Sequence, residues 1–252
     1  FTDIKEQIPN LQQAYFAGGE PLITESHYEL LEEMIRAGRT DIILRYNTNL
    51  SKLKFKDKDL MDLWGRFTNK VQVYGSLDHF GEKAEYIRNG TKWEEIMTNY
   101  RTLLASDVVE LSITTSISIF NYASITDFFD YLIDNNIAPW NEPNRGAWQI
   151  NPIYSPYSLS FQSLPAEYKE RIALQHAEYS NNKLKRLSHN NIMYSQVELL
   201  ISQLGQLATL ASSTNMWEQQ KGNFRHEVQK IDQRRGEDFS PVFPELAGLM
   251  ND

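Results

Sequence analysis

The sequence predicts an α/β fold with a parallel sheet, followed by a mainly helical region. Over the first two-thirds of the chain, short apolar runs alternate with amphipathic stretches at helical spacing. After Pro156 this pattern gives way to long polar helical stretches. Strict alternation of strand and helix with short connections is typical of parallel strands joined by right-handed crossovers.

The predicted strands and helices of the first part follow one another in turn. Large apolar side chains recur every three to four residues at Tyr28, Leu31 and Ile35, which indicates a helix. The run Ile42-Ile43-Leu44 lacks alternation, which predicts a strand buried on both faces. The strands are expected at Gln13–Ala17, Asp41–Asn47, Lys70–Leu77, Val108–Ser116 and Ala147–Ile153. The helices between them are expected at Glu25–Ala37, Lys58–Phe67, Trp93–Ala105 and Ile125–Asn135.

The change of pattern divides the chain into residues 1–160 and a helical C-terminal region of residues 161–252. Pro, Asn and Gly residues at 141–146 predict a loop shortly before the boundary. The helices of the second region are expected at Pro165–Asn181, Asn190–Ser212 and Asn215–Arg234, with a short apolar tail at Phe243–Met250.

Composition narrows the functional classes. The chain has 252 residues, 41% of them hydrophobic and 23% charged, which is ordinary for a globular protein. A formal charge of −8 argues against nucleic acid or an anionic membrane as partner, and no apolar stretch reaches the roughly 18 residues of a membrane span. The chain has no cysteine, which excludes disulfides and thiolate-held metal sites, and its five histidines lack metal-ligand spacing. We therefore expect a cytoplasmic protein without a metal site of its own.

A double glycine closes the first predicted strand, in the run Ala17-Gly18-Gly19-Glu20-Pro21. Two residues without Cβ let the main chain take φ > 0, or approach a ligand closely, at no steric cost. Pro21 fixes φ and suits the first turn of the helix that follows. The same pattern also fits a tight strand-to-helix turn that binds nothing.

Small polar and charged residues follow the other predicted strands as well. Ligands of parallel α/β sheets bind outside the carboxyl ends of the strands, so this edge predicts a site for a polar ligand with amine, carboxylate and hydroxyl groups. Each residue also has a structural interpretation as a turn former, a helix cap or part of a surface ion pair such as Glu85 with Arg88. The candidates beyond the double glycine are Asn47, Ser76, Asp78, Arg88, Thr114 and Asn151.

Several blocks, taken in order, resemble the radical SAM proteins. They are residues 16–22, 46–49, 76–78 and 84–93. The tail blocks 231–236 and 243–246 resemble, more weakly, the subgroup with a shortened SPASM module, or twitch domain. The resemblance implies a partial (β/α)6 TIM-like barrel over residues 1–160, without its first strand and cluster loop, followed by a twitch-like helical region over residues 161–252.

The resemblance also implies which residues bind S-adenosylmethionine (SAM). The main chain of Gly18, Gly19 and Glu20, next to Pro21, would receive the methionine amino group. Residues matching Ser76, Asp78 and Arg88 would hold the ribose and the carboxylate, for which the planar fork of an arginine is well suited. Asn47 belongs to the same strand-end set, and Thr114 and Asn151 are expected from their positions to line the interior nearer the substrate.

The chemistry of that family requires a [4Fe–4S] cluster on a Cys-x3-Cys-x2-Cys loop, for which this sequence has no residues. Either the chain is a fragment of a longer protein, which its start at Phe1 favours, or it is a degenerate member. The parent would cleave SAM reductively and abstract hydrogen from a peptide or small-molecule substrate. The chain alone is expected to be inactive, and no catalytic residue is assigned.

Two other classes of function stay open. One is a non-catalytic interaction protein on a degenerate barrel, marked by an exposed apolar patch near Ile192, Met193, Val197 and Leu200. An open sheet edge near residue 13 also predicts pairing between two copies. The other is a hydrolase with Glu20 and Asp78 as paired carboxylates, which nothing else in the sequence supports.

Overall fold

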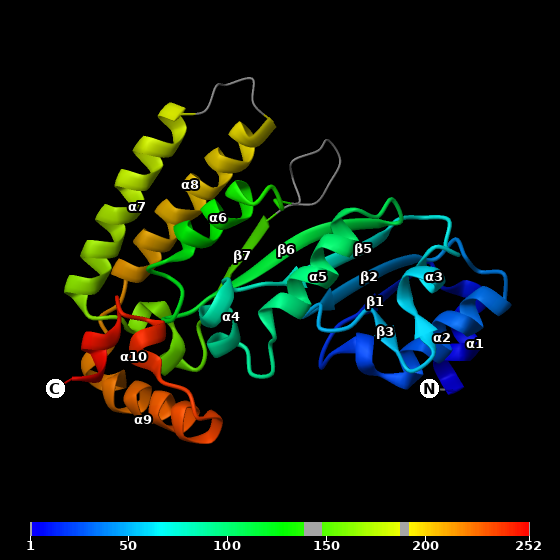
Figure 1. The fold of residues 1–252 in the computed structure, drawn as a ribbon, viewed down its shortest axis with the longest axis horizontal. Coiled ribbons are helices and arrows are strands. Elements are labelled where there is room, and N and C mark those ends of the chain that lie inside the picture. Colours follow the sequence, from blue (N-terminus) through cyan, green and yellow to red (C-terminus); the bar gives the residue numbers. More distant parts are fainter. Residues whose placement is uncertain (1, 139–147, 187–191, 252) are drawn as a thin grey trace.

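A parallel five-stranded sheet organises the first part of the chain (Figure 1). The computed structural model describes residues 2–138, 148–186 and 192–251. Within these residues the strands lie side by side in chain order, β1-β2-β5-β6-β7, which confirms the predicted α/β architecture. β1 and β7 form the two edges of the described sheet. The strands are β1 (Gln13–Phe16), β2 (Ile43–Thr48), β5 (Val71–Ser76), β6 (Val109–Ile117) and β7 (Trp148–Pro152).

The helices between these strands contribute apolar stripes to a single core. Trp93, Ile96 and Tyr100, for example, are buried at helical spacing on α5. Strands in chain order with crossovers of one hand place their helices on the same face of a sheet. The helices of this part are α1 (Thr2–Gln7), α2 (Glu25–Arg36), α3 (Leu60–Trp64), α4 (Gly81–Ile87), α5 (Trp93–Leu104) and α6 (Ile125–Asp134), with the 3-10 helices η1 (Ile8–Asn10) and η2 (Pro21–Ile23).

The sheet is buried on one face only, which corrects the expectation of burial on both. β2 and β5 alternate strictly between buried and more exposed positions. Ile42 and Leu44 are fully buried, whereas Ile43 between them is 36% exposed. The reason is that one face packs against the helices and the other carries polar side chains. We call the first the core face and the second the polar face.

The predicted helix Lys58–Phe67 is wrong in its first residues. A small antiparallel hairpin of β3 (Lys54–Phe55) and β4 (Lys58–Asp59) stands there instead, with Lys56 at φ 55° in its turn. The helix α3 begins after Asp59, whose carboxylate accepts a hydrogen bond from the Met61 N–H at 2.9 Å. Strands of two residues are too short to leave a periodic signal in the sequence.

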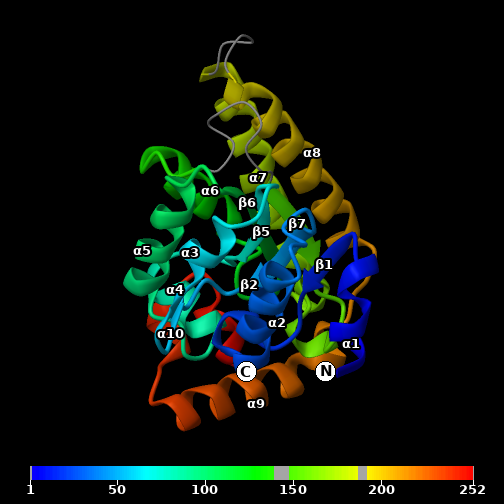
Figure 2. The same ribbon diagram turned by 90° about the vertical axis from the view of Figure 1, so that its right-hand side faces the viewer.

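Three long helices form most of the second part. α7 (Ala166–Arg186) and α8 (Ile192–Ser212) run as a pair beyond the β7 side of the sheet, and α9 (Trp217–Arg235) lies across one end of the molecule (Figures 1 and 2). Among the described residues, no helix is long and apolar enough to cross a membrane. The shorter elements are η3 (Tyr157–Leu159), η4 (Phe161–Ser163), α10 (Phe239–Val242) and η5 (Ala247–Met250).

The predicted apolar patch on α8 is not exposed at Val197 and Leu200, the two of its residues whose side chains the structure describes. Val197 and Leu200 are at most 1% exposed, because α8 packs against α7. The side chains of Ile192 and Met193, and the predicted loop at 141–146, lie outside the described residues. The marker expected of an interaction protein is therefore absent at Val197 and Leu200.

The C-terminal tail packs directly on the segments that follow β5 and β6. The Tyr86 hydroxyl donates to Asp232 at 2.9 Å, and Arg235 donates to the Tyr86 carbonyl at 2.7 Å. The ring of Phe120 lies 5.5 Å from that of Phe243. These contacts join residues 1–160 and 161–252 through a shared core rather than through a linker.

Candidate functional site

The double glycine forms an exposed left-handed turn at the end of β1. Gly18 has φ 84° and Gly19 has φ 56°, a region that residues with a Cβ rarely adopt. A Cβ at either position would meet no atom within 4 Å. The glycines are therefore required by main-chain conformation, and the space beside them is open to a ligand.

Glu20 fastens this turn to the neighbouring strand. One carboxylate oxygen accepts hydrogen bonds from the Thr48 hydroxyl at 2.7 Å and the Leu22 N–H at 3.2 Å. The other accepts the Asn49 N–H at 2.8 Å. Charge-assisted hydrogen bonds of this kind are stronger than neutral ones. Glu20 thus positions the turn through its side chain, and its buried neighbour Pro21 begins η2.

Asp78 fastens the ends of β5 and β6 in a similar way. Its two carboxylate oxygens accept the Ser116 N–H and the Arg88 Nε–H, each at 2.7 Å. Asp78 is buried, whereas the Arg88 side chain is 33% exposed and its terminal nitrogens make no further hydrogen bond within the described residues. Glu85 caps the start of α5 by accepting the Trp93 N–H at 2.7 Å, and forms no pair with Arg88.

Asn121 completes this edge, and the sequence analysis missed it. Its side-chain amide donates to the carbonyls of Asp78 and Ser116, each at 2.9 Å. The residue is fully buried. It stands five residues beyond the predicted strand end at Ser116, so its position along the chain does not mark it as a strand-end residue. We call Gly18, Gly19, Glu20, Asp78 and Arg88 the rim.

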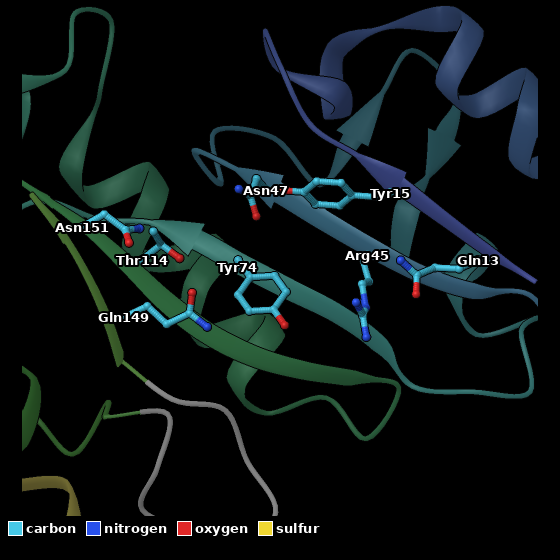
Figure 3. Close-up of a pocket in the computed structure, with 8 residues that line it drawn as sticks. All are labelled: Gln13, Tyr15, Arg45, Asn47, Tyr74, Thr114, Gln149 and Asn151. Atoms are coloured by element: carbon cyan, nitrogen blue, oxygen red, sulfur yellow. The ribbon is translucent and has the colours of Figure 1, made fainter. Parts of the chain in front are cut away.

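A polar cleft lies on the polar face of the sheet (Figure 3). Its volume is about 290 Å³. All five strands contribute to it: β1, β2 and β7 each give two alternate residues, and β5 and β6 give one each. Gln13 and Arg45 lie at one end of the cleft, and Thr114 and Asn151 lie at the other. The lining residues are Gln13, Tyr15, Arg45, Asn47, Tyr74, Thr114, Gln149 and Asn151.

The predicted site residues therefore fall into two groups. Gly18, Gly19, Glu20, Pro21, Asp78 and Arg88 lie at or beside the rim, whereas Asn47, Thr114 and Asn151 line the cleft. Ser76 connects the groups, because it pairs in register with Thr114 and stands two residues before Asp78 of the rim. Five cleft residues were missed: Gln13, Tyr15, Arg45, Tyr74 and Gln149. Their alternation along the strands is the signal that would have found them.

Two titratable groups on the core face of the sheet, His27 and Tyr46, have pKa values shifted by burial toward their neutral forms. Burial lowers the pKa of His27 to about 4, and the His27 Nε2 lies 2.8 Å from the Tyr46 hydroxyl. Burial also raises the pKa of Tyr46 well above its usual range. Within the described residues no group of His, Cys, Asp or Glu side chains is arranged to hold a metal ion. Charge near the site therefore comes from Glu20, Asp78, Arg88 and Arg45.

Comparison with known proteins gives distant structural likenesses only. No protein-family model matches the chain, and no curated protein matches it. Native anSMEcpe with bound AdoMet and Cp18Cys peptide is similar at a TM-score of 0.48 and 14% identity, over 72% of this chain and 51% of that one. Native anSMEcpe with bound AdoMet gives 0.47 and 14%, over 72% and 50%. The chain thus spans about half the length of these structures, and a likeness this distant does not establish family membership.

Proposed function

We propose that the rim binds S-adenosylmethionine, and that the chain is a fragment of a radical SAM protein whose residues 1–160 form a partial barrel. The observation that carries the proposal is the exposed left-handed turn at Gly18 and Gly19, held in place by Glu20. The ordered strand-end blocks that resemble the radical SAM proteins support the same assignment. The substrate of the parent protein is a peptide or small molecule in this proposal.

The rim residues fit the amino acid part of SAM. The main chain of Gly18 and Gly19 offers polar groups in open space, to which an amino group can donate. Arg88 keeps its terminal nitrogens for a carboxylate while Asp78 holds its Nε. The Asp78 carboxylate is already engaged by Ser116 and Arg88, so its role in this site is to position Arg88 rather than to bind ribose itself.

The residues present do not fit a [4Fe–4S] cluster. Such clusters are held by cysteine thiolates, and the chain contains none. We therefore assign no reaction step to these residues. In this proposal the chain binds and positions SAM. Any reductive cleavage of SAM requires cluster ligands from outside these 252 residues.

The test is isothermal titration of SAM into the wild-type chain and into Arg88→Gln. We expect binding by the wild type and about tenfold weaker binding by the variant, because a charge-assisted contact is lost. Arg66→Gln removes the same charge from an exposed loop and should bind as the wild type does. Circular dichroism checks that Arg88→Gln is folded. No SAM binding by the wild type, or equal binding by Arg88→Gln, would overturn the proposal.

A further inference from the structure

The polar cleft contains an arginine that no acidic residue neutralises within the part of the chain that the structure describes. Arg45 donates from Nε to the Gln72 side chain at 2.6 Å and forms no ion pair within the described residues. It is the one charged residue lining the cleft among those described. Most guanidinium groups that are partly withdrawn from water have an anionic partner, because an unpaired charge there is costly. The missing partner points to an anion supplied from outside.

The neighbouring strands do not supply that anion. In the register of the sheet, Arg45 pairs with Gln72, and Gln72 pairs with Glu110 on the far side. Gln72 thus separates the two charges, and Glu110 does not line the cleft. The Gln72 contact fixes Nε of Arg45 and leaves the two terminal nitrogens for another acceptor.

The rest of the lining favours amide-bearing ligands. Gln13, Asn47, Gln149 and Asn151 each offer a carboxamide, which can donate to and accept from a peptide group. Tyr15 and Tyr74 add phenol rings, and no acidic side chain is present in this lining. A volume of about 290 Å³ lies at the small end of ligand pockets and suits a molecule of dipeptide size.

We infer that the polar cleft is a binding site for a small carboxylate that also carries amide groups, with Arg45 as the anchor of the carboxylate. An acylated dipeptide or the carboxyl end of a peptide has this chemistry. The ligand lies on the polar face with its carboxylate at the Gln13 end and its amide groups toward Asn151 (Figure 3). The inference does not depend on SAM binding at the rim, which uses Arg88 rather than Arg45.

The test uses N-acetylglycylglycine and its neutral C-terminal amide as matched probes. Proton–nitrogen NMR spectra of the chain are recorded during titration with each probe, and the side-chain amide signals of Asn47, Gln149 and Asn151 report on the cleft. We expect the carboxylate probe to shift these signals and to bind at least about tenfold more tightly than the amide.

Variants of Arg45 test whether this residue anchors the carboxylate, or whether the net charge of the protein alone attracts it. Arg45→Gln should lose that tenfold preference, and Arg45→Lys should keep part of it, because lysine retains the charge without the planar fork. Arg66→Gln is the matched control and should behave as the wild type. Failure of the carboxylate probe to move the cleft signals would overturn the inference, as would equal binding of both probes or unchanged binding by Arg45→Gln.

A parallel SAM titration keeps the two proposals apart. Arg45→Gln should bind SAM as the wild type does, since Arg88 stays in place. Binding of the dipeptide probe without binding of SAM would refute the proposed function and support the inferred carboxylate site in the cleft. Binding of SAM without binding of the dipeptide probe would support SAM binding at the rim and refute the inferred carboxylate site in the cleft.

Discussion

The two faces of the same sheet differ in almost every physical respect. On the core face, Leu44, Tyr46 and Val73 are at most 1% exposed and pack in one continuous apolar cluster. On the polar face, Arg45, Asn47 and Tyr74 occupy the positions between them in the strands and line a cleft. Stability and binding are therefore assigned to alternate residues of the same strands, and substitutions one position apart should separate the two.

The largest contrast is expected between Leu44 and Arg45. Leu44→Ala leaves a cavity in the core and should lower the free energy of unfolding by about 3 kcal/mol. Arg45→Ala removes a half-buried side chain that has no ion pair among the described residues, and it should cost under about 1 kcal/mol. Urea unfolding followed by circular dichroism measures both. Equal losses would show that the polar face is packed as a second core.

The pair Thr115 and Thr114 gives a sharper contrast without a change of size. The buried Thr115 hydroxyl donates to the Leu77 carbonyl and accepts from the Trp148 indole, each at 2.6 Å. Thr115→Val leaves the Leu77 carbonyl and the Trp148 indole without these hydrogen bonds and should lower the free energy of unfolding by about 2 kcal/mol. Thr114→Val on the polar face should change the free energy of unfolding by under about 0.5 kcal/mol. Thermal or urea unfolding of the two variants decides whether the faces differ as described.

The smallest effect concerns pH and again comes from the core side. Burial holds the pKa of His27 at about 4, below the 6.5 of an exposed histidine, so the unfolded chain takes up the proton first. The stabilisation is complete above pH 6.5 and is lost as the pH falls toward 4. Between pH 7 and pH 5 His27 should account for roughly 1.5 kcal/mol of lost stability.

His27→Gln removes that contribution while keeping a side chain that can bond the Tyr46 hydroxyl. Its free energy of unfolding should therefore fall less steeply between pH 7 and pH 5 than that of the wild type. His226→Gln changes an exposed histidine and should leave the slope unaltered. An identical slope in His27→Gln and the wild type would contradict the assignment of a neutral buried histidine.

Much of the fold follows from periodicity along the chain. The five strands and the helices α2, α5 and α6 are long enough to show their pattern, and each was predicted within a few residues. The hairpin at Lys54–Asp59 and the seven-residue helix α4 were not predicted, because elements this short do not show a periodic pattern of apolar residues. Three consecutive apolar residues at 42–44 also concealed the alternation of β2, and with it the polar face.

The candidate site was predictable where main-chain geometry leaves a mark in the sequence. Positive φ at Gly18 and Gly19 demands glycine, so that turn was visible in the residue types alone. Arg45 has no such mark, because an arginine within a strand reads as an ordinary surface residue. Only the register, which aligns Arg45 with Gln72 and places it beside Tyr74 in the cleft, shows that it faces other polar groups. Long-range pairing of this kind is set by the whole sheet.

The order of the strands in the sheet also predicts the order in which their amide protons exchange with solvent. β5 is bonded to β2 on one side and β6 on the other, whereas β1 has a single partner among the described strands. Amide protons at the centre exchange with solvent only when the whole sheet opens, but those at an edge exchange through local fraying. In heavy water, deuterium therefore enters at the edge strands β1 and β7 first and reaches β5 last. The rim turn follows β1, so it lies beside one of the two edges at which the described sheet opens by local fraying.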